Sequence, residues 1–388
     1  MLKNIDNKIN ILIILNLIIL NYFFFIFESL NFFVKINFFL FVMFSILYLI
    51  KFEKNKFLII FILFIIIIAL GTPTNAWDAR SIWLFKAKQI FYDQTIFATN
   101  NNYALFAHSN YPNLVPAFVA SLVNVLGYWN EIYPKIGVTL MFVPGIIIIS
   151  SFFDKNFFLF FLSIMLFIIG KFFVNGELDG LLSVYFVAVI LTLYSFSKRK
   201  IIILSEYLTL ISLLIILSLI KVEGIILLVS IFIGFAMAFL KKNNYSKKII
   251  ICFLISIIPF LLWNYYCFNS GIENNSSLNS ISIKSLNDRF LNFENYILIF
   301  DHLILNDKFL FGLIFFVISI FCYKSKDLLI IGASISLLYI LFLFVIYLST
   351  PLNLEWHLNS ATRVIKPIAL FLSILALFNI FNKKYNYK

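Results

Sequence analysis

The sequence predicts an all-α fold, a polytopic transmembrane bundle of about 12 helices, each expected to cross a bilayer. Of the 388 residues, 62% are hydrophobic and only 12% are charged, and the mean hydropathy is +1.01. Soluble globular domains carry about 25% charged residues, so this composition excludes that class. Apolar runs long enough to cross a bilayer also recur along the chain and are separated by polar connections. We therefore interpret the chain as an integral membrane protein.

The first three expected spans cover residues 8–28, 31–51 and 57–71. Three lysines at 51–56 occupy the second connection, and short basic connections are retained on the cytoplasmic side of a membrane. The N-terminus is then inside, and the chain after residue 71 lies outside.

Four short basic connections fix the later spans: 197–200, 241–248, 323–326 and 382–388. Three apolar segments follow between residues 113 and 172. All four basic connections lie on the cytoplasmic side only if one of these three segments does not cross the membrane. Segment 113–127 is the shortest and contains Pro116 and Asn124, so we assign it to a juxtamembrane or re-entrant helix. The remaining expected spans are 130–150, 156–172, 180–197, 201–220, 223–240, 248–266, 309–323, 327–348 and 364–381.

Charge gathers for the first time in residues 74–88, within the first outer loop. Apolar residues follow at helical spacing and predict a juxtamembrane helix lying on the bilayer surface. Asp78 lies near the start of this helix, where a carboxylate is favoured by the exposed backbone N–H groups and the helix dipole. On the pattern alone, this structural role of Asp78 and a functional role stay equally open.

Nearly every ionisable group capable of chemistry falls on the outer face in this topology. Charged groups at a membrane boundary cost free energy unless they pair or serve a site. The outer groups are Asp78 and Arg80; His108 to Pro112; Glu177 and Asp179; Lys221 and Glu223; the loop from Cys267 to Lys308; and residues 350–357 with Arg363.

Composition and spacing argue against two kinds of partner. The net charge of +12 is explained by basic residues retained inside, so no nucleic acid is expected. Cys252, Cys267 and Cys322 show no metal or disulfide spacing. No Asp-x-Asp pair or carboxylate–His cluster marks a divalent cation, so no metal and no cofactor are predicted, with a divalent cation as the alternative.

Five stretches, taken in order, resemble the successive signatures of the polytopic GT-C glycosyltransferases. The resemblance is strongest to the branch of the protein O-mannosyltransferases, the lipid A aminoarabinose transferase and related bacterial membrane sugar transferases. It divides the chain into two additional N-terminal transmembrane helices at 1–56 and a GT-C-like core at 57–388. The five stretches are 77–88, 108–116, 175–180, 220–224 and 355–363.

The resemblance implies an enzyme that transfers a sugar from a polyprenyl-phosphate carrier, with inversion, to a glycolipid, polysaccharide or protein. Asp78 matches the family's first-loop catalytic carboxylate, which implies a general base. Asp179 matches a second-loop acidic position that binds the acceptor or orients a cation, with Glu177 as its competitor. The implied location is the inner membrane, with the site facing the periplasm and with membrane lipids as partners.

The departing phosphate needs cations, and Arg363, Lys221 and His357 are the candidates. For Arg363 the alternative is ordinary snorkelling at a helix end. For Lys221 the alternative is a local ion pair with Glu223. The expected substrate-binding set is completed by Arg80, His108, Tyr111 and Glu223.

Two other functional classes stay open: a flippase of lipid-linked sugars, and a polysaccharide polymerase or ligase. A flippase predicts inverted repeats or charged residues near the bilayer midplane. The sequence shows neither feature, and this absence favours a transferase over a flippase.

Overall fold

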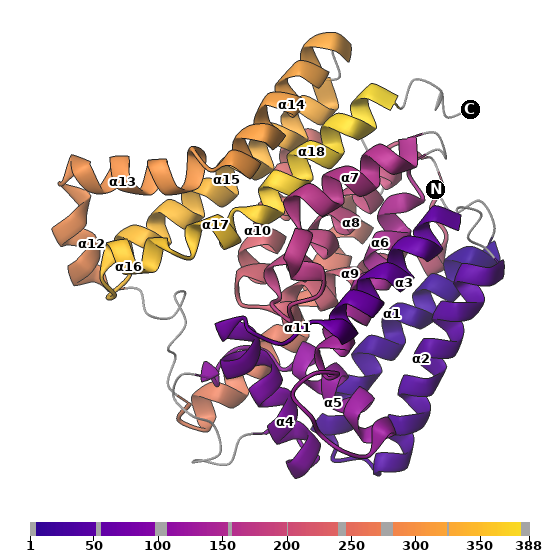
Figure 1. The fold of residues 1–388 in the computed structure, drawn as a ribbon. Coiled ribbons are helices and arrows are strands. Elements are labelled where there is room, and N and C mark those ends of the chain that lie inside the picture. Colours follow the sequence, from indigo (N-terminus) through magenta and orange to yellow (C-terminus); the bar gives the residue numbers. More distant parts are fainter. Residues whose placement is uncertain are drawn as a thin grey trace.

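A computed structural model describes residues 5–51, 56–97, 107–153, 157–199, 201–239, 246–272, 282–323 and 326–381. Over these ranges the regular structure is helical and contains no strand, which confirms the all-α class. The bundle helices (Figure 1) are α1 (Ile5–Ile26), α2 (Asn31–Lys51), α3 (Lys56–Gly71), α6 (Lys135–Ser150), α7 (Phe158–Ile168), α8 (Asp179–Ser197), α9 (Leu204–Ile220), α10 (Glu223–Phe239), α11 (Ser246–Asn269), α14 (Asp307–Tyr323), α15 (Lys326–Ser349) and α18 (Lys366–Phe381).

Shorter helices lie in the connections at one end of the bundle. The first loop, between α3 and α6, contains several helices, as expected, including α5, the segment predicted not to cross the membrane. These shorter elements are η1 (Ala79–Trp83), α4 (Leu84–Asp93), α5 (Leu114–Leu126), η4 (Gly170–Phe173), α12 (Ile283–Phe290), α13 (Phe293–Ile304), α16 (Leu354–Leu358) and α17 (Ala361–Val364).

The expected number of 12 spans is wrong, because several of the helices are too short to cross a membrane. Each expected stretch is helical, but only six described helices are long and apolar enough to cross a membrane, or seven if the bent pair α13–α14 counts as one. The others have 10–17 residues. A helix rises 1.5 Å per residue, so 16 residues reach about 24 Å, less than the hydrocarbon core. The sequence pattern overestimated these lengths because apolar turns, such as η4 after α7, continue the apolar runs.

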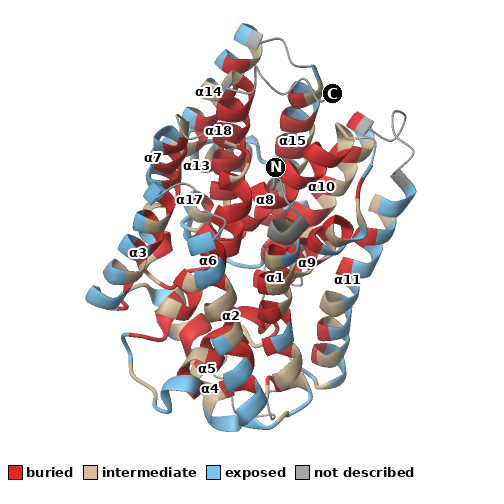
Figure 2. Ribbon diagram, turned by 90° about the vertical axis from the view of Figure 1, so that its right-hand side faces the viewer, coloured by how far each residue is buried: buried red, intermediate tan, exposed pale blue. Residues whose placement is uncertain are grey.

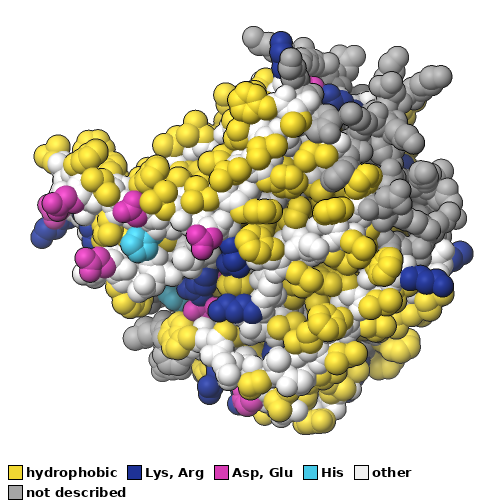
Figure 3. Space-filling model, turned by 45° about the horizontal axis from the view of Figure 1, so that its top comes forward, with side chains coloured by type: hydrophobic (Ala, Val, Ile, Leu, Met, Phe, Trp, Pro, Cys, Tyr) yellow, Lys and Arg dark blue, Asp and Glu magenta, His cyan; other side chains and the backbone are white. Residues whose placement is uncertain are grey.

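The long apolar helices are those of a multi-pass membrane protein. Helix α8 is almost entirely buried and packs against α6, α9, α10 and α18, so it forms the centre of the bundle (Figure 2). Helices α2 and α11 instead leave most of their apolar side chains at least partly exposed. Figure 3 shows a broad hydrophobic surface of this kind. Such a surface suits lipid as the surrounding solvent.

The bundle has two polar ends. At one end, Lys8 lies 2.9 Å from Glu206, and Lys198 lies 2.6 Å from Asp327. This is the end of the expected basic connections, of which residues 200, 241–245, 324–325 and 382–388 lie outside the described residues. Because successive helices alternate in direction, the connections after α3, α7 and α9 and before α18 meet at the opposite end. Which end faces the cytoplasm stays a prediction.

Candidate functional site

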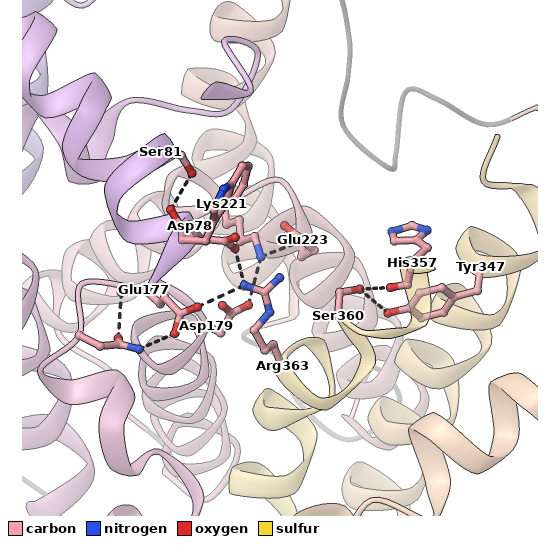
Figure 4. A network of polar contacts seen from close by, with 12 residues as sticks. Asp78, Ser81, Glu177, Asp179, Lys221, Glu223, Tyr347, His357, Ser360 and Arg363 are labelled. Atoms are coloured by element: carbon pink, nitrogen blue, oxygen red, sulfur yellow. Dashed lines mark hydrogen bonds and ion pairs between the residues drawn. The ribbon is translucent and has the colours of Figure 1, made fainter. Parts of the chain in front are cut away.

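Arg363 joins carboxylates from two distant parts of the chain (Figure 4). Its Nη1 atom donates to Oδ2 of Asp78, 285 residues away, and to Oε1 of Glu177 at 3.3 Å. Asp78 directly precedes η1, Glu177 lies in the turn before α8, and Arg363 belongs to α17. The structure therefore places together three residues that the sequence analysis had assigned to one site.

Lys221 forms the other half of the site. Its Nζ atom lies 3.1 Å from Oδ1 of Asp179 and 3.2 Å from Oε1 of Glu223. Burial by itself lowers the pKa of Lys221, but the two carboxylates outweigh it and raise that pKa well above its ordinary value. Lys221 is therefore a permanent cation that is already paired, so the local ion pair foreseen as the alternative is present.

We call these six residues the ion cluster: Asp78, Glu177, Asp179, Lys221, Glu223 and Arg363. Its two halves interact, because Asp179 also attracts Arg363 electrostatically. Four carboxylates and two cations give a net charge of −2 when all are ionised. The cluster is therefore acidic, which does not suit Arg363 and Lys221 as the main binders of a phosphate.

Asp78 does not act as a helix cap. It lies at the start of η1, a π-helical turn, and makes no side-chain capping hydrogen bond. Trp77 before it is 60% exposed, whereas the Asp78 side chain turns inward and is 15% exposed. The side-chain partner of Asp78 is therefore Arg363 and not a backbone N–H group of its own helical turn, while the favourable helix dipole predicted as the alternative stays open. Single π-helical turns are also frequent at functional sites.

Gly176 allows the turn that carries Glu177 to approach η1. Its φ is +83°, and an added Cβ would lie 3.2 Å from the Cβ of Ala79. We expect Gly176→Ala to lower the free energy of unfolding by about 1–3 kcal/mol, because the left-handed backbone is strained for alanine and Ala79 must also move.

The matched control is Gly127→Ala, since Gly127 has φ +84° but would place its Cβ in open space. Denaturation in detergent measures both variants. An equal loss in both would show that the contact with Ala79 contributes nothing.

An aromatic stack lies beside the ion cluster. The ring of Tyr111 stacks on Trp83 at 5.5 Å and on His108 at 5.0 Å between centroids. Burial raises the pKa of Tyr111, and the carboxylates of Glu223 and Asp78 raise it further. Tyr111 therefore stays protonated and keeps a hydroxyl donor near the carboxylates. His108 reaches the site through this stack.

Lys86 supports the same loop from within the protein. It is fully buried, and its Nζ atom donates to the backbone oxygen of Tyr111 at 2.9 Å. Burial lowers the pKa of Lys86 to about 7. Since an unfolded lysine titrates near pH 10.4, the unfolded chain binds more protons between these values, and stability rises with pH through that window.

We therefore expect Lys86→Met to flatten the rise in stability between about pH 7 and pH 10. Thermal unfolding at several pH values measures this slope. Lys88→Met, in the same helix but at a half-exposed position, serves as the control and should keep the wild-type slope. An unchanged slope in Lys86→Met would contradict this assignment.

Two predicted residues lie apart from the ion cluster. Arg80 is exposed and pairs with none of the described acids. His357 packs edge-to-face on Tyr347, 4.9 Å between ring centroids. The Tyr347 hydroxyl bonds to Oγ of Ser360 at 2.8 Å, and Ser360 bonds to the backbone of His357 (Figure 4). His357 thus belongs to the support of α17, which carries Arg363.

Two groups around the site were not predicted from the sequence. Tyr339, whose hydroxyl donates to the backbone oxygen of Val364 at 2.8 Å, holds α17 from the other side. Three lysines, Lys171, Lys308 and Lys366, lie at helix ends close to one another, and Lys366 interacts electrostatically with Asp179. The available signal was weak, because a lysine at the end of an apolar run is ordinary in a membrane protein.

Among the described residues, no group of three or more His, Cys, Asp or Glu side chains is arranged to hold a metal ion. Compared with protein-family models, curated proteins and solved structures, the chain matches none. The geometry of the ion cluster therefore carries the functional argument.

Proposed function

We propose that the protein is a membrane glycosyltransferase that moves a sugar from a polyprenyl-phosphate carrier to an acceptor hydroxyl at the outer face of the inner membrane. The observation that carries this proposal is the contact between Asp78 and Arg363 inside a largely buried cluster of charges. Buried ion pairs rarely stabilise a fold more than apolar packing does. Charged groups gathered in an otherwise apolar bundle therefore favour a site over a structural lock.

In the proposed reaction the acceptor oxygen bonds to the anomeric carbon while the bond from that carbon to the phosphate oxygen breaks. The electron pair leaves with the polyprenyl phosphate, the configuration inverts, and Asp78 takes the proton of the acceptor hydroxyl. Arg363 holds Oδ2 of Asp78. The other oxygen, Oδ1, accepts no hydrogen bond from the described residues, so it is available to the acceptor.

The surplus of carboxylates supports a hydroxyl-rich ligand. An ionised carboxylate only accepts hydrogen bonds, and sugar hydroxyls are donors. Oε2 of Glu223 is buried and has no hydrogen-bond partner among the described residues, although burial of such an atom is costly. We assign Glu223, with Glu177 and the hydroxyl of Tyr111, to hydroxyl groups of the sugar or the acceptor.

The test is to incubate membranes that contain the protein with polyprenyl phosphates carrying radiolabelled sugars. We expect the label to leave the carrier, free polyprenyl phosphate to appear in equal amount, and a labelled product to form. Membranes without the protein are the control.

A flippase would instead change the leaflet of the intact donor without releasing polyprenyl phosphate. A polymerase or ligase would release the carrier while forming chains of many sugar units. If no carrier breaks down with any hexose or pentose donor, the proposal is wrong.

A further inference from the structure

Lys171, Lys308 and Lys366 form a basic group, which we call the lysine triad. The Nζ atoms of Lys366 and Lys171 lie 4.7 Å and 5.8 Å from the ring centroid of Phe172. Nζ of Lys308 donates to the backbone oxygen of Ile168 at 3.1 Å. The triad thus joins η4 and the first turns of α14 and α18 at the same end of the bundle as the ion cluster.

The triad carries uncompensated positive charge. No ion pair between described residues involves any of its lysines, and this includes Asp307, the sequence neighbour of Lys308. Lys366 is 5% exposed and is repelled by the other two lysines. Asp179 attracts Lys366, but it already pairs with Lys221. Lys366 is thus a buried cation with no carboxylate of its own among the described residues, which is costly, so the triad favours a bound anion.

An apolar groove lies between the helices that carry the triad or directly precede it in sequence. The groove has a volume of about 380 Å³ and lies between α7, α14 and α18, whose ends carry the lysines. Phe167 and Phe311 have ring centroids 5.0 Å apart. Phe311 lies about one helical turn after Lys308 in α14, and Phe167 lies at the end of α7, four residues before Lys171. The lining residues are Phe160, Ser163, Ile164, Phe167, Phe311, Phe315, Leu377 and Ile380.

We propose that the lysine triad and this groove bind the carrier lipid, with its phosphate against the lysines and its isoprenoid chain in the groove. The assignment to the sugar carrier rests on the proposed function. Both cations of the ion cluster are already paired with carboxylates, and the cluster is acidic. The triad lies at the same end of the bundle and has positive charge to spare, so we place the leaving phosphate there.

The test measures binding of sugar-free polyprenyl phosphate to the purified full-length protein in detergent. Lys366→Gln should weaken this binding about tenfold or more, because one charge-assisted bond to phosphate is lost, and the triple change to Gln should weaken it further. Binding of polyprenol, which has no phosphate, should not change. Lys284→Gln, an exposed lysine on α12, is the control.

Ser163→Trp provides a second variant that fills the groove without changing any charge, and it should weaken binding of both polyprenyl phosphate and polyprenol. Unchanged binding in folded triple and Ser163→Trp variants would overturn the proposal. Equal competition by phosphatidylglycerol would overturn the assignment to the carrier in favour of a bilayer phospholipid.

This assay also separates the two proposals. If polyprenyl phosphate binds through the triad while no sugar is transferred, the proposed function fails and the lipid site stands. If sugar is transferred but the triple variant binds the carrier normally, the lipid site fails alone.

Discussion

Asp78→Asn is expected to lower the rate of sugar transfer about 10²- to 10⁴-fold, the usual contribution of a general base. Asparagine has the shape of aspartate, and its carbonyl oxygen still accepts from Arg363, but it does not take up the acceptor proton. Arg363 also keeps Glu177 as a partner, so the fold should survive. The measurement is the initial rate of transfer from labelled carrier, with thermal unfolding as the check on folding.

Asp93→Asn is the matched control for this experiment. Asp93 ends α4 in the same loop, is exposed, and forms no ion pair with a described residue. Its variant should transfer sugar at the wild-type rate. A folded Asp78→Asn protein with the same activity as Asp93→Asn would remove Asp78 from the chemistry.

The second large effect concerns stability. Lys221→Met should lower the free energy of unfolding by about 3–5 kcal/mol, because it leaves the carboxylates of Asp179 and Glu223 buried without their cation. The Lys221 side chain is 7% exposed, so solvent does little to screen this loss. Denaturant unfolding in detergent measures the change.

Two further variants show whether charge is the cause. Lys88→Met breaks the exposed pair with Glu131 and should cost less than about 1 kcal/mol. Adding Asp179→Asn to Lys221→Met removes one buried charge and should restore part of the stability. Equal losses for Lys221→Met and Lys88→Met, or a double variant no more stable than the single one, would contradict the electrostatic explanation.

The meeting of Asp78 and Arg363 could be predicted because it depends mainly on the alternation of helix direction. Once the basic connections are placed at one end, the loop after α3 and the segment before α18 must share the other. This placement depends only on whether the number of crossings between the two segments is even or odd. The error in helix length therefore does not change it. The direction of the helices does not predict which side chains pair, however, because pairing depends on how the helices pack.

The rest of the site depends on that packing. Lys221 was expected to serve the phosphate, yet α8 and α10 place Asp179 and Glu223 against it. Lys171 and Lys308 lie far apart in sequence and at no motif spacing, so only the packing of α7 against α14 and α18 brings them together. Helix length was misjudged for a related reason, since an apolar turn such as η4 cannot be distinguished from helix by hydropathy.

The long separation between Asp78 and Arg363 has a consequence for biogenesis. Asp78, Glu177 and Asp179 emerge from the ribosome well before the guanidinium that Asp78 and Glu177 bind, 285 and 186 residues later. Until then Asp78 and Glu177 lack the guanidinium that joins them in the folded protein. Assembly of the ion cluster therefore waits until α17 has been made, because only then can Arg363 fix the orientation of Asp78 and Glu177.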